Sequence, residues 1–171
     1  KNYEIIICAP DTKKDKIFKK ISNKLGIKYY FGSEKNVLQR YYFAAKKFNA
    51  ETIIRLTSDC PLIDINLIKK ISNLYEQNNY DYVSNVNPPT FPDGMDVEVF
   101  NFKTLKKVFY QATNKEDKEH VTKLIRYSNN FKKLNYFNLV DYSNIRITLD
   151  YIEDYKLIKT IINKFKNQNI G

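Results

Sequence analysis

The sequence has few of the residues on which disulfide frameworks and membrane proteins depend. It contains two cysteines, Cys8 and Cys60, too few for a disulfide framework or a cysteine-based zinc site. We therefore expect two buried free thiols in a reducing compartment. No apolar run reaches the roughly 18 residues of a membrane helix, and the apolar stretch near the N-terminus is too short for a signal peptide. These absences predict a cytoplasmic protein with no membrane partner.

Arginine is also scarce. The net charge of +10 comes mostly from lysines that are scattered through helix-like segments and form no single block. A general basic surface explains this charge, and a surface that attracts anionic substrates stays open as an alternative. We do not expect a nucleic-acid partner, because no recognisable nucleic-acid-binding module is present.

What the sequence does contain is an alternation of short β-branched runs with longer stretches of helical period. This alternation predicts an α/β fold with a mostly parallel sheet and helices on both faces. A length of 171 residues with 43% hydrophobic residues suits a single domain over residues 1–171. Strands are expected at residues 5–8, 29–31, 52–57, 81–84, 96–100, 131–139 and 145–149, and helices at 12–25, 34–48, 61–78, 102–113, 115–128 and 151–167.

Two of the expected strands end in the same pattern. Residues 54–59 read Ile-Arg-Leu-Thr-Ser-Asp, and residues 145–150 read Ile-Arg-Ile-Thr-Leu-Asp. Each pattern places its aspartate, Asp59 or Asp150, at the C-terminal end of a strand, where ligands bind in open α/β sheets. Two converging carboxylates suit Mg²⁺. The alternative is that each aspartate caps the helix that follows it.

A second acidic pair follows a loop rich in proline and glycine. Asp96 and Glu98 alternate with valines, which predicts that both carboxylates share one strand face. They are candidates for binding sugar hydroxyls, and a solvated strand face is the alternative.

Four sequence blocks carry a resemblance to a known family. Residues 31–42 read FGSEKNVLQRYY, residues 55–64 read RLTSDCPLID, residues 92–100 read PDGMDVEVF and residues 119–122 read EHVT. In this order they resemble the spore-coat polysaccharide cytidylyltransferase family, which is related to the CMP-sugar synthetases. The match runs from about residue 4 to residue 165.

The resemblance implies a Rossmann-like nucleotide-diphospho-sugar transferase fold and a Mg²⁺-dependent enzyme. Such an enzyme transfers a nucleotidyl group from CTP to a sugar or sugar phosphate and releases pyrophosphate, here in polysaccharide synthesis. The family's two metal aspartates correspond to Asp59 in Asp-Cys-Pro and to Asp150 in the block that ends at Asp154. Relatives are commonly dimers, so a homodimer is the partner that the resemblance suggests.

The resemblance also adds candidates for substrate binding. Arg55 is a catalytic candidate that would reach a phosphate or a sugar carboxylate, and pairing with a carboxylate inside the sheet is its alternative. Ser58 lies in the same block. His120, the only histidine, matches the family block at residues 119–122, with a helix-surface or packing role as the alternative. Arg40 is a further substrate-binding candidate, although structural pairing suits its place behind an apolar helical stripe.

The sequence departs from the family pattern near its start. The residues after the first apolar run, Ala-Pro-Asp-Thr-Lys-Lys, form no phosphate-binding loop, and the match begins at the family's second strand. We therefore expect either a fragment or a naturally short relative, with weak or no activity of the 171 residues alone. The alternative function is a non-catalytic relative that binds a sugar or nucleotide, or a subunit completed by a partner segment.

Overall fold

The structure, a computed structural model, describes residues 3–165. The chain divides into two compact units, one made of residues 1–53 and 101–130 and the other of residues 54–100 and 131–171. The expectation of a single domain stays a prediction. The net positive charge of the chain lies in the first unit, and the second is close to neutral. Within residues 3–165, no helix is both long enough and apolar enough to cross a membrane.

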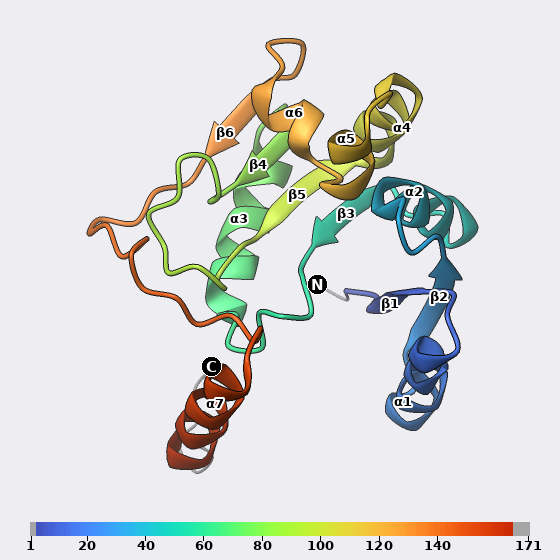
Figure 1. Cartoon of the computed structure of the whole chain (residues 1–171). Helices are drawn as coiled ribbons and strands as arrows, with labels where there is room; N and C mark the ends of the chain where they lie inside the picture. The colour runs from blue at the N-terminus through green and yellow to red at the C-terminus, as the bar shows by residue number, and fades with distance from the viewer. Residues whose placement is uncertain (1–2, 166–171) are drawn as a thin grey trace. The chain divides into compact units, whose positions relative to one another are not determined.

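The first unit begins with a parallel strand pair and the helix that joins its strands. Gly26 ends this helix in the left-handed conformation, with φ +66°, which glycine adopts without steric cost. The connection from one parallel strand to the next through a helix is the βαβ arrangement that the sequence predicts (Figure 1). The elements are β1 (Ile6–Pro10), a short 3-10 helix (Lys14–Lys16), α1 (Ile17–Leu25) and β2 (Lys28–Gly32).

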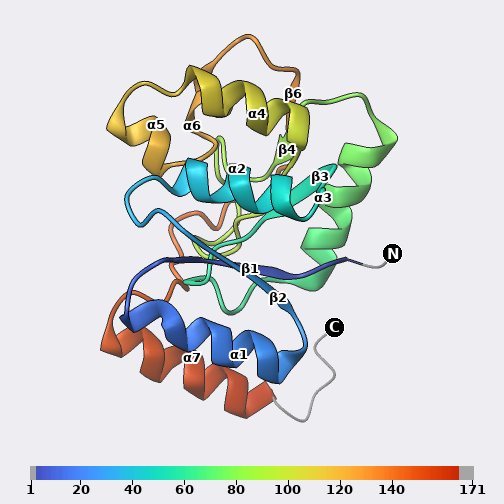
Figure 2. The same ribbon diagram turned by 90° about the vertical axis from the view of Figure 1, so that its right-hand side faces the viewer.

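Four further helices complete the first unit. Tyr42 of α2 stacks on Phe109 of α4, with 4.2 Å between the ring centroids, and the two helices lie side by side in Figure 2. The single helix expected at residues 115–128 is instead two short helices. The break lies at Val121, whose φ is +24° and whose side chain is fully buried. The helices are α2 (Val37–Lys47), α4 (Phe102–Gln111), α5 (Lys115–Glu119) and α6 (Lys123–Tyr127).

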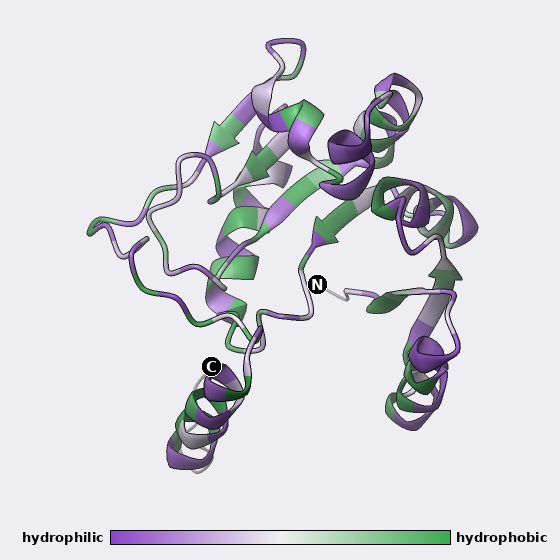
Figure 3. Ribbon diagram, in the orientation of Figure 1, coloured by the Kyte–Doolittle hydropathy of each residue, from purple (hydrophilic) through white to green (hydrophobic). Residues whose placement is uncertain are grey.

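The second unit is built on a mixed sheet with strand order β3-β5-β4-β6. Strand β4 runs antiparallel to β5 and parallel to β6. The apolar side of α3 packs on this sheet, and Figure 3 shows hydrophobic residues along both α3 and the central strands. The α/β fold class is thus confirmed. The elements are β3 (Thr52–Arg55), α3 (Ile65–Gln77), β4 (Tyr82–Ser84), β5 (Glu98–Asn101), β6 (Lys133–Asn135) and α7 (Ile152–Phe165).

The core of the second unit forms where α3 meets β4 and β5. Its central side chains, Ile71, Val83, Val97 and Val99, have no exposed surface. Burying four such side chains contributes roughly 1.5–3 kcal/mol each. This core fixes the ends of the strands from which the candidate site residues emerge.

The strand expected at residues 145–149 is not present. Its β-branched pattern favours an extended backbone, but among residues 3–165 it forms no ladder with a neighbouring strand. Arg146 makes only an isolated parallel bridge to Asp93. The strand prediction was therefore wrong.

Candidate active site

The first candidate aspartate lies in a tight turn that follows β3. The backbone N–H of Cys60 donates to the carbonyl of Thr57 (3.2 Å) and closes a turn that contains Ser58 and Asp59. The Cys60 thiol lies 3.1 Å from Thr57 Oγ1 and donates weakly to Asp59 Oδ1 at 3.6 Å. Within residues 3–165, the other oxygen of Asp59 accepts no hydrogen bond.

Asp59 does not cap the following helix. Asp64 does so instead, because its Oδ1 accepts the backbone N–H of Asn66 at 2.7 Å. Asp64 therefore fills the capping role that was the alternative for Asp59. The Asp59 carboxylate remains available for another role.

The segment that leads to Asp150 is held by two backbone attachments. The backbone carbonyl of Asp93 accepts from the N–H of Ile147 (2.8 Å), and the N–H of Asp93 donates to the carbonyl of Ile145 (2.9 Å). The N–H of Leu149 donates to the carbonyl of Asp59 (2.7 Å). The residue before Asp150 is thus bonded directly to the peptide of Asp59. The sequence prediction that these two chain positions converge is in line with this contact.

Gly94 allows the close approach of the two segments. Its φ is +106°, and a Cβ atom at this position would lie 3.0 Å from the carbonyl carbon of Ile147. A Cβ here would press on the backbone of Ile147 and Thr148 as well as on the Ile147 side chain. The steric need for a residue without a Cβ therefore explains the glycine in the Pro-Asp-Gly block.

Asp150 is held through one of its two carboxylate oxygens. Its Oδ2 accepts from Thr148 Oγ1 (2.6 Å) and from Arg146 Nη1 (3.1 Å). Its side chain is 47% exposed, and no described residue between 3 and 165 donates to Oδ1. Asp150 accepts no backbone N–H from these residues, so the capping alternative is not observed for it either.

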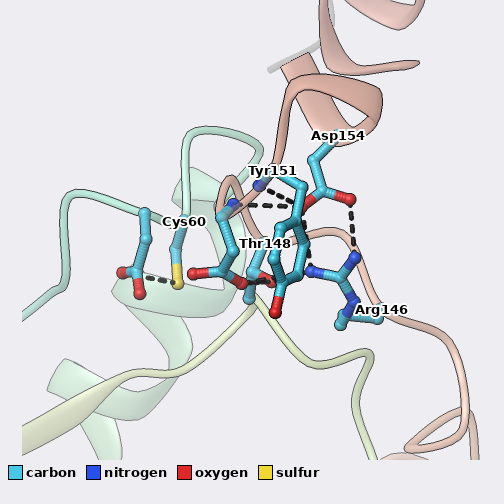
Figure 4. A network of polar contacts seen from close by, with 7 residues as sticks. Cys60, Arg146, Thr148, Tyr151 and Asp154 are labelled. Atoms are coloured by element: carbon cyan, nitrogen blue, oxygen red, sulfur yellow. Dashed lines mark hydrogen bonds and ion pairs between the residues drawn. The ribbon is translucent and has the colours of Figure 1, made fainter. Parts of the chain in front are cut away.

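Asp154 performs the capping at the start of α7. Its Oδ2 accepts the backbone N–H groups of Asp150 (3.0 Å) and Tyr151 (2.9 Å), the reach-back contact of a capping box. Its carboxylate also forms a bidentate pair with Arg146 (Figure 4). The hydrogen bond from Arg146, followed by these backbone bonds, lowers the pKa of Asp154 to about 2. The sequence prediction assigned no function to Asp154, although its spacing from Asp150 was visible.

Arg55 and Glu98 form an ion pair inside the sheet. Glu98 is 2% exposed, its Oε2 accepts from Arg55, and its Oε1 accepts from the hydroxyl of Tyr82 at 2.6 Å. Internal pairing, the alternative for Arg55, is therefore the observed contact. A solvated strand face is excluded for Glu98 by its burial.

Asp96 lies close enough to Cys60, in the turn after β3, to act on its thiol. Its negative charge, together with that of Asp59, adds to the effect of burial, which raises the pKa of the Cys60 thiol to about 11. Asp96 is half-buried. Ser58, Asp59 and Asp96 thus belong to one region of the second unit.

Arg40 and His120 belong to the first unit. Arg40 is 9% exposed, and its Nη1 donates to the carbonyl of Ser33 at 2.6 Å. Among the residues that the structure describes, Arg40 has no carboxylate partner within ion-pair distance. His120 ends α5 with an exposed side chain. Their roles in substrate binding stay predictions.

The donor set at Asp59 and Asp150 suits a hard divalent cation. Each carboxylate keeps one oxygen that accepts no hydrogen bond from residues 3–165, and Mg²⁺ is typically held by one or two carboxylates with substrate phosphates completing its shell. No cluster of three or more histidine, cysteine or acidic residues suited to a metal occurs in the described part of the chain. A protein-only cage is thus not the kind of site that these residues form.

Comparison with known proteins adds an independent line of support. A family model described as cytidylyltransferase matches residues 1–168. An uncharacterised protein of Methanocaldococcus jannaschii is 36% identical over 170 residues, which cover 98% of this chain and 69% of the relative. The spore coat polysaccharide biosynthesis protein SpsF of Bacillus subtilis is 29% identical over 164 residues, which cover 94% of this chain and 67% of SpsF.

A solved structure shares the fold. The cytidylyltransferase from Leptospira borgpetersenii serovar Hardjo-bovis matches with a TM-score of 0.89 and 32% sequence identity. The match covers 94% of this chain and 68% of that protein. A likeness of this extent confirms the Rossmann-like α/β architecture.

Proposed function

This chain belongs to the cytidylyltransferase family, and from that premise we propose that it transfers a cytidylyl group from CTP to a sugar or sugar phosphate. A sugar oxygen attacks the α-phosphorus of CTP, the bond between the α-phosphorus and the bridging oxygen to the β-phosphate breaks, and pyrophosphate leaves. Such a reaction depends mainly on positioning and on neutralising negative charge. SpsF, whose name refers to spore coat polysaccharide biosynthesis, supports a role in polysaccharide synthesis.

The observation that carries the proposal is the backbone contact between Asp59 and the residue before Asp150. The hydrogen bond between Leu149 and the Asp59 carbonyl ties the two segments together, and each aspartate keeps a carboxylate oxygen without a donor among the described residues. In the proposal these two oxygens hold Mg²⁺. When bound, the cation would neutralise phosphate charge and make the α-phosphorus more electrophilic.

The chain's other residues have supporting roles in this proposal. Ser58 and Asp96 lie in the same unit as Asp59 and Asp150, and in the proposal Ser58 binds substrate and Asp96 accepts hydrogen bonds from sugar hydroxyls. Arg55, whose guanidinium is paired with Glu98, fixes the end of β3 from which the turn with Asp59 begins. The substrate-binding roles of Arg40 and His120, which lie in the first unit, stay predictions from the family resemblance.

Pyrophosphate release from CTP tests the proposal. The whole protein is supplied with Mg²⁺, CTP and a panel of sugars and sugar phosphates, with UTP, ATP and GTP in parallel. We expect CTP-dependent release that falls on the order of 100-fold or more in Asp59→Asn and Asp150→Asn, since several kcal/mol of charge stabilisation is lost. Asp64→Asn is the matched control, because asparagine also caps helices and Asp64 lies only five positions from Asp59. Turnover that is the same in all three variants would overturn the proposal.

A further inference from the structure

The carboxylate of Asp154 connects the backbone and the side chain of Asp150. It accepts four hydrogen bonds, two from the backbone N–H groups of Asp150 and Tyr151 and two from Arg146. The bidentate contacts to Arg146 measure 3.0 Å from Nη1 to Oδ2 and 2.6 Å from Nη2 to Oδ1. Only 12% of the Asp154 side-chain surface is exposed.

Arg146 links the Asp154 carboxylate to the side chains of Thr148 and Asp150. Its Nη1 also donates to Thr148 Oγ1 (2.8 Å) and to Asp150 Oδ2 (3.1 Å). Thr148 in turn donates to the same oxygen of Asp150 at 2.6 Å. The planar guanidinium fixes the directions of its donors, so the bidentate pair with Asp154 sets where Nη1 points. Figure 4 shows Arg146 between Thr148 and Asp154, with Tyr151 beside them.

The result is an asymmetric Asp150 carboxylate. Oδ2 is fixed by two donors, while Oδ1 accepts none from residues 3–165. A ligand carboxylate whose second oxygen is hydrogen-bonded presents its first oxygen in one orientation. Outer partners of this kind typically change metal affinity 10–100-fold when they are mutated.

We propose that Asp154 is a positioning residue for the metal-binding carboxylate of Asp150 and acts through Arg146. This inference rests on the proposed function, because it assumes that Asp150 holds the cation. Asp154 itself supplies no ligand in this account, since Arg146 and two backbone N–H groups occupy its oxygens.

A purely structural role for Asp154 makes a different prediction. If Asp154 only caps α7, its replacement lowers the free energy of unfolding and leaves metal affinity unchanged. Asp154→Asn separates the two roles, because asparagine keeps one carbonyl oxygen for the backbone N–H groups. It replaces the other oxygen with an amide N–H₂ that cannot accept from Arg146.

The test is a titration of Mn²⁺ binding in the presence of CTP. The amount of free Mn²⁺ is measured by its electron paramagnetic resonance signal. We expect Asp154→Asn to weaken Mn²⁺ binding about 10–100-fold. The control is Glu153→Gln, which removes the same charge from the preceding, exposed position of α7. Arg146→Lys is a second variant, and it is expected to weaken binding to a similar extent because a point charge cannot replace the bidentate fork.

Two further comparisons decide the outcome. In an Arg146→Gln background, Asp154→Asn is expected to add little, since the two residues act in series. A full additional loss in that background would overturn the inference. Unchanged binding in both Asp154→Asn and Arg146→Lys, with binding lost in Asp150→Asn, would also overturn it and leave the proposed function standing. Unchanged binding in Asp150→Asn would instead contradict the proposed function.

Discussion

The backbone N–H of Leu149 donates a hydrogen bond of 2.7 Å to the carbonyl oxygen of Asp59. This bond joins the turn after β3 to the segment before α7, although the two are about 90 positions apart in the chain. It places the residue before Asp150 against the peptide of Asp59. This backbone contact supports the proposal that Asp59 and Asp150 share one metal site.

Gly94→Ala is expected to disturb the segment that carries Asp150. The new Cβ would lie 3.0 Å from the backbone of Ile147, and the φ of +106° at position 94 is unfavourable for alanine. Gly26→Ala is the matched control, because φ is also positive there but no atom lies within 4 Å of the new Cβ. We expect Gly26→Ala to lower the free energy of unfolding by about 1 kcal/mol, and Gly94→Ala by about 1–3 kcal/mol more.

Urea unfolding of both glycine variants, with Mn²⁺ binding measured alongside, checks this prediction. Gly94→Ala should weaken Mn²⁺ binding as well as stability, whereas Gly26→Ala should affect stability alone. Equal losses of stability in the two variants would show that the approach to Ile147 is not restrictive.

Glu98→Gln is expected to destabilise the protein by about 3 kcal/mol, because it leaves Arg55 in the sheet without its carboxylate. The double variant Arg55→Met with Glu98→Leu should lose much less, since no unpaired charge remains. The exposed ion pair of Glu116 with Lys123 provides the control, and Glu116→Gln should leave stability unchanged within error. Chemical denaturation measures the free energy of unfolding of the three variants. A double variant less stable than Glu98→Gln would contradict the account.

The thiol of Cys8 is expected to react slowly in the folded protein. Burial raises its pKa from 9.0 to about 11, so at pH 8 its thiolate fraction is about 100-fold lower than in the unfolded chain. Because the folded pKa is the higher one, the thiol's contribution to stability is fully present below pH 9 and is lost as the pH rises through 11. Iodoacetamide labelling at pH 8 with and without urea, read by mass spectrometry, measures the ratio of the labelling rates of Cys8 in the unfolded and the folded protein. Equal rates would show that Cys8 is not shielded.

Much of this fold could be predicted from local sequence pattern. The strands near residues 6–10, 28–32 and 98–101 follow β-branched and aromatic runs, and Gly26 marks the end of α1. The segment at 145–149 has the same local pattern, but whether such a run joins a sheet depends on a neighbouring strand, and local pattern carries no information about that neighbour. Local pattern also misses the helix break at Val121. There the side chain is buried and the backbone has an unfavourable positive φ, and burial depends on tertiary neighbours.

The site was predictable to a similar degree. The repeated Ile-Arg-x-Thr-x-Asp pattern identified Asp59 and Asp150 as a pair and named Arg55 and Arg146 with them. It could not tell that Arg55 pairs with Glu98 while Arg146 pairs with Asp154, because these partners are set by tertiary neighbours. The capping residues, Asp64 and Asp154, lie five and four positions beyond Asp59 and Asp150, the aspartates for which capping was the alternative.

The joint binding of a divalent cation by Asp59 and Asp150 is tested most directly by crystals of the whole protein grown with CTP and Mn²⁺. Anomalous scattering locates the Mn²⁺ ion. The account predicts an anomalous peak about 2.2 Å from one carboxylate oxygen of each aspartate, with CTP phosphate oxygens completing the shell. A peak bonded to neither aspartate, or carboxyl groups more than about 8 Å apart in the CTP complex, would contradict it.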